Sequence, residues 1–250
     1  MSVKDKVAIV TGGSRDIGKA ISLQLAAGGA KVVVNYHNNA AHGAETVKAI
    51  TDAGGTAIAV AGDMTKSADV DKLVAEAVAA FGDKVDILVN VVGGLVARKS
   101  LDEMDEEFFD HVMKLNVNSV FLAMKKVVPL MGDGGSVVNL SSLAGRDGGG
   151  PGAVAYATSK GAIMTFTRGM AKELGPKNIR VNCVCPGMIS TTFHDEFTKD
   201  EVRKNVAAGT PLRREGQADE VANLVTYLAS SESSFLTGTS VDINGGLAFS

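Results

Sequence analysis

Tyr156 and Lys160 are the two residues whose types and spacing suggest chemistry most directly. Residues four apart lie on one face of a helix, one turn from each other. A phenol with its ordinary pKa of about 10 gives up a proton poorly at neutral pH, and a nearby ammonium favours the phenolate. We therefore expect Lys160 to lower the pKa of Tyr156 and Tyr156 to act as a general acid. A core tyrosine is the structural alternative, so the surrounding motifs must decide.

A glycine-rich turn near the amino end provides the first of those motifs. The apolar run Val7–Val10 leads into Thr11–Gly18, and a helical pattern of apolar residues follows. Gly12 and Gly18 allow a tight turn and close helix packing, so that free N–H groups and the helix dipole can face a pyrophosphate. This order of strand, glycine turn and helix predicts a dinucleotide site.

Composition restricts the remaining classes of function. The chain has 250 residues, of which 45% are hydrophobic, and a net charge of −3. These values are typical of a single globular domain and do not favour nucleic acid as a partner. The first residues contain no apolar signal core and the longest apolar runs are strand-sized, so we expect no membrane span and a cytoplasmic location.

The chain has 2 cysteines, Cys183 and Cys185, which stand two positions apart in an apolar run. That spacing strains a disulfide, and two thiols are too few for a metal site. We expect reduced, buried core residues and no bound metal.

Short β-branched runs alternate with amphipathic helical stretches along the whole chain. Strands are expected at 7–10, 31–36, 56–61, 86–90, 136–140, 179–184 and 240–243, and helices near 40–53, 67–81, 105–131, 154–175 and 218–229. Nearly all-apolar strands in such an alternation indicate a parallel sheet covered on both faces. The pattern predicts one α/β domain over residues 1–250, with a Rossmann-like, doubly wound parallel sheet.

Polar residues and glycines follow the ends of these strands, where ligands of such sheets bind. The residues are Asp63, Asn90, Gly93, Ser141, Ser142, Pro186 and Gly187. Each alone is also ordinary turn chemistry. Their order, however, resembles the short-chain dehydrogenase/reductase family along essentially the entire chain. The resemblance rests on Thr11–Gly18, Asp63, Asn90–Gly93, Asn116, Ser142–Gly145, Tyr156–Lys160 and Pro186–Thr191.

This resemblance implies four catalytic residues. Tyr156 would donate the proton in carbonyl reduction, and Lys160 would lower its pKa and hold the nicotinamide ribose. Ser142 would bind the substrate carbonyl, and Asn116 would hold a water that links Lys160 to solvent. The structural alternatives are a helix-bend Asn116, a capping Ser142 and a core Tyr156.

The resemblance also implies where the dinucleotide binds. The positions are Gly12, Ser14, Arg15, Asp16, Ile17, Gly18, Tyr36, His37, Asp63, Met64, Asn90, Gly93, Tyr156, Lys160, Pro186, Gly187, Ile189 and Thr191.

The chain departs from the family pattern at Asp16 and Val91. Asp16 replaces the usual third glycine of the turn, and Val91 replaces an asparagine that ties neighbouring strands together. In the first helical turn a carboxylate is favoured by the dipole, and it also disfavours a 2′-phosphate at the adenosine end. Tyr36 and His37 stand where the family places Asp or Arg, and the charge of Arg15 is offset by Asp16. NAD(H) is therefore favoured over NADP(H).

Three loops resemble a narrower group, the NADH-dependent reductases of alginate degradation that convert 4-deoxy-L-erythro-5-hexoseulose uronate to 2-keto-3-deoxy-gluconate. The loops are 93–99, 144–153 and 188–199. This resemblance implies an acidic sugar substrate under a lid around residues 188–213, which we call the lid segment. Substrate contacts are expected from Arg98, Ser142, Arg146, Gly148, Gly149, Gly150, Tyr156 and His194, with the arginines recognising the carboxylate.

Two other functions remain open. A 3-oxoacyl-[acyl-carrier-protein] reductase would share the catalytic set and need a basic docking surface, for which Lys125, Lys126 and Lys172 are available. A catalytically silent dinucleotide-binding protein is the alternative of a different class. By resemblance we also expect a homotetramer, paired through the helices near 105–131 and 154–175.

Overall fold

The computed structural model describes residues 3–249, so residues 1–2 and 250 of the expected domain lie outside the described residues. A 7-stranded parallel sheet runs in the order β3-β2-β1-β4-β5-β6-β7. The strands are β1 (Val7–Thr11), β2 (Lys31–Tyr36), β3 (Thr56–Ala61), β4 (Ile87–Asn90), β5 (Ser136–Leu140), β6 (Arg180–Pro186) and β7 (Ser240–Ile243). Chain order reverses between β1 and β4, which confirms the predicted doubly wound α/β fold.

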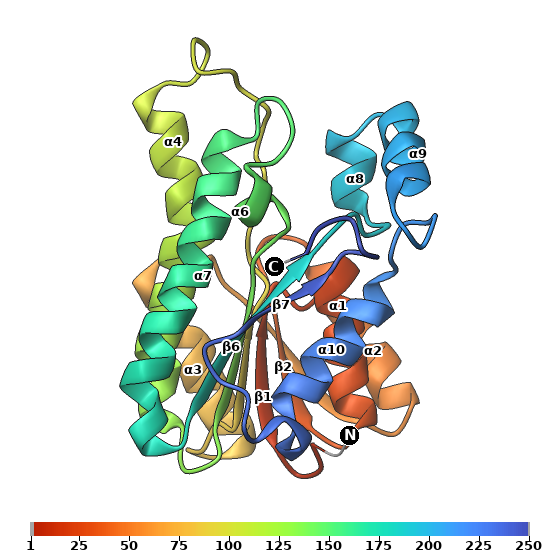
Figure 1. Ribbon diagram of the computed structural model, residues 1–250. Helices are drawn as coiled ribbons and strands as arrows, with labels where there is room; N and C mark the ends of the chain where they lie inside the picture. Colours follow the sequence, from red (N-terminus) through yellow and green to blue (C-terminus); the bar gives the residue numbers. More distant parts are fainter. Residues whose placement is uncertain (1–2, 250) are drawn as a thin grey trace.

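Both faces of the sheet are covered because successive strand residues point to opposite sides. In β1, Ile9 belongs to one apolar core, whereas Ala8 and Val10 belong to the other. The first core packs against α3 (Ser67–Phe81), α5 (Ser119–Val127) and α7 (Val154–Leu174), and the second against α1 (Asp16–Ala27), α2 (Ala40–Asp52) and α10 (Ala218–Ala229). Figure 1 shows these helices on the two sides of the sheet.

The expected helix at 105–131 is divided into four parts. They are α4 (Glu106–Met113), the π-turn η1 (Lys114–Asn118), α5 and the 3₁₀ turn η2 (Val128–Leu130). Asn116 lies inside the π-turn, and its side-chain amide donates to the carbonyl oxygen of Val112 at 2.9 Å. A single π-turn within an α-helix is frequent at functional sites.

The carboxyl ends of the strands carry short helices that the sequence analysis did not separate. These are α6 (Ala144–Asp147) after β5, and α8 (Thr192–Phe197) and α9 (Asp200–Gly209) within the lid segment. Figure 1 shows α8 and α9 above that edge of the sheet, facing α6 and the first turns of α7. A parallel bridge between Ile189 and Gly216 closes the base of the lid segment.

Two smaller turns complete the assignments, η3 (Gly175–Lys177) and η4 (Ser231–Ser233). Cys183 and Cys185 are buried free thiols, as predicted. Within residues 3–249, no helix combines the length and the apolar character that a membrane crossing requires.

In the turn between β1 and α1, the backbone of Gly18 packs directly against that of Gly12. A Cβ on Gly18 would stand 2.0 Å from the carbonyl oxygen of Gly12, a backbone atom that cannot move aside. We expect Gly18→Ala to lower the free energy of unfolding by about 1–3 kcal/mol or more, as overpacking does. Thermal unfolding measures the change.

Gly169→Ala is the matched control, because a Cβ there meets nothing within 4 Å and the residue lies within α7. That substitution should leave stability unchanged or raise it slightly. Equal stability of the two variants would contradict the tight turn.

Candidate active site

Tyr156 and Lys160 meet on the first turns of α7, next to the carboxyl end of β5. The Lys160 Nζ lies 5.6 Å from the centroid of the Tyr156 ring. Lys160 is 4% exposed, and its Nζ donates to the carbonyl oxygen of Leu140, the last residue of β5, at 2.9 Å. Tyr156 is half-buried. The expected pairing of phenol and ammonium on one helix face is therefore present.

Burial controls the charge of both groups. It raises the pKa of Tyr156 to about 12, and the hydrogen bond with the Ser142 hydroxyl acts in the opposite direction. It also lowers the pKa of Lys160 to about 8. The prediction of a lowered phenol pKa is wrong, because desolvation disfavours the phenolate and the ammonium is directed toward Leu140. Tyr156 consequently holds its proton at neutral pH, ready to donate it.

The loop after β5 places Ser142 beside the phenol. The Ser142 Oγ accepts from the backbone N–H of Ala144 at 3.1 Å, and the same hydroxyl is hydrogen-bonded to the phenol of Tyr156. Ser141 donates to the Lys160 carbonyl oxygen at 2.7 Å and so fixes the loop on α7. Gly145 allows this contact, because a Cβ there would lie 2.8 Å from the backbone N of Gly161.

Asn116 is fully buried, and the polar atoms of its side chain already have hydrogen-bond partners. Its Oδ1 accepts from the Gly94 N–H at 2.9 Å, and its Nδ2 donates to the carbonyl oxygens of Gly94 and Val112. These bonds fix the orientation of the Asn116 amide, and the expected role of this residue in holding a water stays a prediction.

Gly93 separates Asn116 from Lys160. A Cβ at this position would stand 2.5 Å from the Asn116 Oδ1 and 2.9 Å from the Lys160 Nζ. The absence of a side chain at Gly93 is thus what lets the ammonium occupy its place.

The glycine turn is tied to the sheet by a residue that the sequence analysis missed. Asn35 in β2 accepts from the Gly12 N–H at 3.0 Å and donates to the carbonyl oxygens of Val60 and Gly62. The sequence signal that could have identified this residue was a single asparagine within the apolar run of β2. Gly12 has φ +64°, and the buried Ser14 accepts through its carbonyl oxygen from Thr46.

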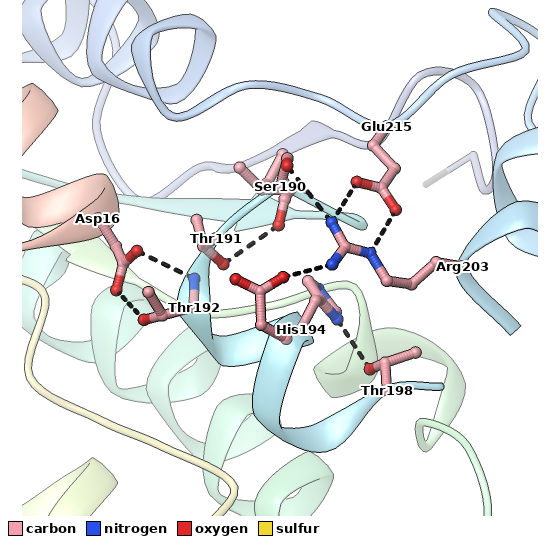
Figure 2. Close-up of polar contacts among 10 residues, drawn as sticks. Asp16, Ser190, Thr191, Thr192, His194, Thr198, Arg203 and Glu215 are labelled. Carbon is pink, nitrogen blue, oxygen red and sulfur yellow. Dashed lines mark hydrogen bonds and ion pairs between the residues drawn. The ribbon is translucent and has the colours of Figure 1, made fainter. Parts of the chain in front are cut away.

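Asp16 does more than begin α1, which is the role expected for it. Its φ is +48°, the left-handed region that the usual glycine would favour. Its carboxylate accepts from the Thr192 N–H at 3.1 Å and from the Thr192 hydroxyl at 2.6 Å. Figure 2 shows both contacts with the lid segment. The Arg15 guanidinium, which is 64% exposed, also donates to the Thr192 hydroxyl. Ile17, the next residue, is half-buried.

The adenosine side of the turn carries no carboxylate in residues 36–39. The Tyr36 ring packs against α2, since a Cβ on Gly43 would lie 2.6 Å from it. His37 is exposed. Asp63, after β3, accepts from the N–H and hydroxyl of Thr65, and these bonds outweigh desolvation and lower its pKa.

The side chains of Met64 and Ile189 are buried in the two cores, so only their backbone atoms can face a ligand. Asn90 donates to the Asn139 Oδ1 at 2.9 Å, which holds the ends of β4 and β5 together. The Pro186 carbonyl oxygen accepts from Leu143.

Two further predicted cofactor positions are fixed by their neighbours. Thr191 donates to the Ile189 carbonyl oxygen at 3.1 Å. Gly187 passes close to the carboxyl-terminal tail, where a Cβ would lie 2.8 Å from the Asn244 Cβ.

The two arginines expected to bind a carboxylate have different positions. Arg98 is exposed and donates to the carbonyl oxygens of Pro151 and Phe197, which links two loops around the site. Arg146 instead pairs with Asp242 at 2.8 Å and donates to the Ser240 carbonyl oxygen. The expectation for Arg146 is therefore corrected: its guanidinium is held on β7.

The glycines at 148–150 shape the loop after α6. Gly148 and Gly149 have φ of +87° and +72°, so the turn itself requires residues without side chains. Gly150 approaches Arg98, whose Nη1 would lie 3.6 Å from a Cβ at that position.

An aromatic group on α8 covers the phenol, and the sequence analysis missed it. The Phe193 ring centroid lies 6.0 Å from that of Tyr156 and 5.3 Å from that of Phe197. His194 meets the Phe193 ring edge-on, and its Nδ1 lies 2.9 Å from the Thr198 hydroxyl. Burial, with the charge of Arg203, lowers the pKa of His194, so the imidazole is neutral at pH 7. The one available signal was the i, i+4 spacing of Phe193 and Phe197.

Known proteins are similar to this chain over nearly its whole length. A family described as enoyl-(acyl carrier protein) reductase matches residues 12–248. An uncharacterized oxidoreductase of Methylorubrum extorquens is 39% identical over 247 residues, with 98% of each chain covered. A short-chain dehydrogenase/reductase from Serratia marcescens superposes with a TM-score of 0.93 at 35% identity, with 99% of each chain covered. A metagenomic blue fluorescent protein in complex with NADPH has a TM-score of 0.93 at 33% identity, with 100% of each chain covered.

If the Tyr156 hydroxyl is the proton donor, turnover should depend on it. Tyr156→Phe removes the proton donor and little else, so kcat for carbonyl reduction should fall by at least about 10²-fold. Binding of the reduced dinucleotide, measured by fluorescence titration, should change little. Tyr227→Phe on α10 is the matched control and should keep full activity. A Tyr156→Phe protein that retained more than about a tenth of the wild-type kcat would remove Tyr156 from the role of acid.

Proposed function

Because the chain belongs to the short-chain dehydrogenase/reductase family, we propose that it is a nicotinamide-dependent carbonyl reductase with Tyr156 as its acid. One observation carries the proposal. A protonated phenol, a buried ammonium and a serine hydroxyl that is hydrogen-bonded to the phenol lie together at the carboxyl edge of the sheet, in Tyr156, Lys160 and Ser142. Charge develops on the carbonyl oxygen during reduction, and positioned donors stabilise it there.

The residues present fit a dinucleotide. The left-handed Gly12 and the tight contact of Gly18 hold the turn close to the start of α1, where the first N–H groups of the helix can face a phosphate. A bound reduced nicotinamide supplies the hydride for the reaction. The Ser142 hydroxyl orients the carbonyl, and Tyr156 transfers its proton to the carbonyl oxygen. The Lys160 ammonium then offsets the charge left on the phenolate oxygen, which it does fully only below its pKa of about 8.

The choice between NADH and NADPH is revised on physical grounds. The sequence favours NAD(H), because the charge of Asp16 would repel a 2′-phosphate; in the structure the carboxylate keeps that charge, but it is directed toward Thr192 in the lid segment and lies 3.8 Å from the Arg15 Nε. Residues 36–39 provide no carboxylate for a ribose 2′-OH, and the Arg15 guanidinium remains 64% exposed although it pairs with Asp16. The similar blue fluorescent protein is in complex with NADPH. We therefore propose NADP(H) as the preferred dinucleotide.

For the substrate we propose a keto-aldehyde uronate, 4-deoxy-L-erythro-5-hexoseulose uronate. The resemblance of the three loops supports this choice, and so does the exposed guanidinium of Arg98 at the mouth of the site. Arg98 uses its Nε and Nη1 on backbone carbonyls, so its remaining nitrogen is the one directed to a carboxylate. Arg146 takes no part in this proposal.

A 3-oxoacyl-[acyl-carrier-protein] reductase is less well supported. Its acidic partner would need free lysines, but Lys126 pairs with Asp71 at 2.7 Å and Lys125 lies over the Phe121 ring, so that the exposed Lys172 is the remaining one of the three expected. A silent binding protein would not need the buried ammonium and its glycine neighbour.

The chain also carries exposed aromatic residues that suit an assembly. Phe121 on α5 is 44% exposed, and Phe235 and Phe249 near the carboxyl end are almost fully exposed. These side chains support the proposal of a homotetramer, since large exposed apolar groups often mark interfaces.

The substrate proposal is tested by following oxidation of NADPH and NADH with the uronate and with a 3-oxoacyl thioester. We expect turnover of the uronate and a higher kcat/KM with NADPH. Arg98→Ala should raise KM for the uronate by about tenfold or more and lower kcat less, because the contact contributes uniform binding.

A neutral keto-aldehyde of similar size is the control substrate. Its KM should not change in Arg98→Ala if Arg98 recognises the carboxylate. An equal rise for both substrates would assign Arg98 to loop structure alone, and a preference for the thioester would overturn the uronate.

A further inference from the structure

The contact between Asp16 and Thr192 joins two parts of the chain that each face the site. Asp16 belongs to the glycine turn, whereas Thr192 is the first residue of α8 in the lid segment. The Asp16 carboxylate accepts from both the backbone N–H and the hydroxyl of Thr192, at 3.1 and 2.6 Å. Figure 2 shows the two bonds side by side.

These bonds replace the local cap that α8 lacks. The residue before α8 is Thr191, and its hydroxyl donates to the Ile189 carbonyl oxygen instead of capping the helix. The first N–H groups of a helix need partners from outside the helix. Asp16 supplies one from 176 positions away in the sequence. The start of α8 is therefore held by the dinucleotide-binding turn.

The end of α8 is held by an opposite charge. The Arg98 Nε donates to the carbonyl oxygen of Phe197, the last residue of α8, at 3.2 Å. A carboxylate at the start and a guanidinium at the end both match the direction of the helix dipole. Between these two attachments lies Phe193, whose ring covers Tyr156.

Ion pairs of Arg203 connect the rest of the lid segment to α8. Arg203 on α9 pairs with Glu215 at 2.7 Å and with Asp195 on α8. Figure 2 shows the Arg203 guanidinium beside Glu215 and Ser190. Contacts at the start of α8 therefore influence the position of the whole segment.

The backbone conformation of Asp16 is unfavourable in free energy for a residue with a side chain. A φ of +48° is a conformation that glycine adopts freely and a side chain adopts rarely, although aspartate tolerates it better than most. A strained residue at a ligand-facing turn persists where its surroundings favour it. Here the two bonds to Thr192 provide that stabilisation.

We propose that Asp16 is a positioning residue that latches the lid segment over the dinucleotide site and thereby sets how long a bound dinucleotide stays. This inference rests on the proposed function, because it places the dinucleotide under α8. Opening the latch would release Thr192 and move Phe193 away from the phenol.

Three variants separate a latch from a simple charge effect. Asp16→Gly removes the carboxylate and suits the left-handed backbone, so the protein should fold at least as well. Asp16→Asn removes the charge but keeps an oxygen that accepts from the Thr192 N–H. Thr192→Val keeps the side-chain shape and removes the hydroxyl.

The first measurement is hydrogen exchange of the α8 amides in the ligand-free protein. The second is the rate at which NADPH dissociates, followed by stopped-flow fluorescence. In Asp16→Gly we expect α8 exchange and NADPH dissociation to become faster by about tenfold, as loss of hydrogen bonds to a charged group predicts. Thr192→Val should show a smaller increase, and Asp16→Asn, which keeps the acceptor for the Thr192 N–H but loses the acceptor for its hydroxyl, should lie between the wild type and Asp16→Gly.

Unchanged α8 exchange in Asp16→Gly would overturn the latch. Equal dissociation rates in Asp16→Asn and Asp16→Gly, both different from the wild type, would overturn it in favour of charge repulsion. Failure of the wild-type protein to bind either dinucleotide would instead refute the proposed function, and the exchange measurement would still decide whether Asp16 holds α8.

Discussion

Burying the Lys160 ammonium costs free energy unless hydrogen bonds replace those that it makes with water. Several neighbouring residues of the site reduce that cost. The carbonyl oxygen of Leu140 accepts one hydrogen bond at the point where β5 ends. Gly93 leaves the space that the amine occupies, and Ser141 holds the backbone of Lys160 in place. The lowered pKa of Lys160 is the remaining consequence, and it brings the group's titration close to physiological pH.

The phenol and the lid segment follow from the same arrangement. Tyr156 lies one helical turn before Lys160 and shares its dry surroundings, so its pKa rises while that of the amine falls. Phe193 adds an aromatic cover to that environment. The cover depends on α8, and α8 is held by Asp16 in the glycine turn and by Arg98 in the loop after β4. The parts of the site are thus connected through the lid segment.

The local sequence pattern was sufficient to predict the strands of the sheet, because an apolar β-branched run can be recognised without knowing which strand pairs with it. The bounds predicted for β2, β3, β5 and β7 match the structure. Pairings across the chain could not be read in this way. Arg146 meets Asp242, 96 positions away, and Asp16 meets Thr192, 176 positions away. A charged residue in a sequence shows what it can bind but not which group the fold brings to it.

The sign of the Tyr156 shift was also beyond the sequence. Spacing shows that an ammonium is near the phenol, whereas the pKa depends on how much water the fold removes from each group. The π-turn at Asn116 has a similar origin, since the Gly94 loop that occupies its side chain lies 22 positions away.

Nuclear magnetic resonance titration of Lys160 in the ligand-free protein tests the central claim most directly, with carbon-13 at the lysine Cε and Lys160→Arg to assign the signal. The account predicts a pKa of about 8 for Lys160, while the Tyr156 hydroxyl keeps its proton well beyond that pH. A Lys160 signal that titrated near the ordinary lysine value of about 10.4 would contradict the buried ammonium on which the site depends.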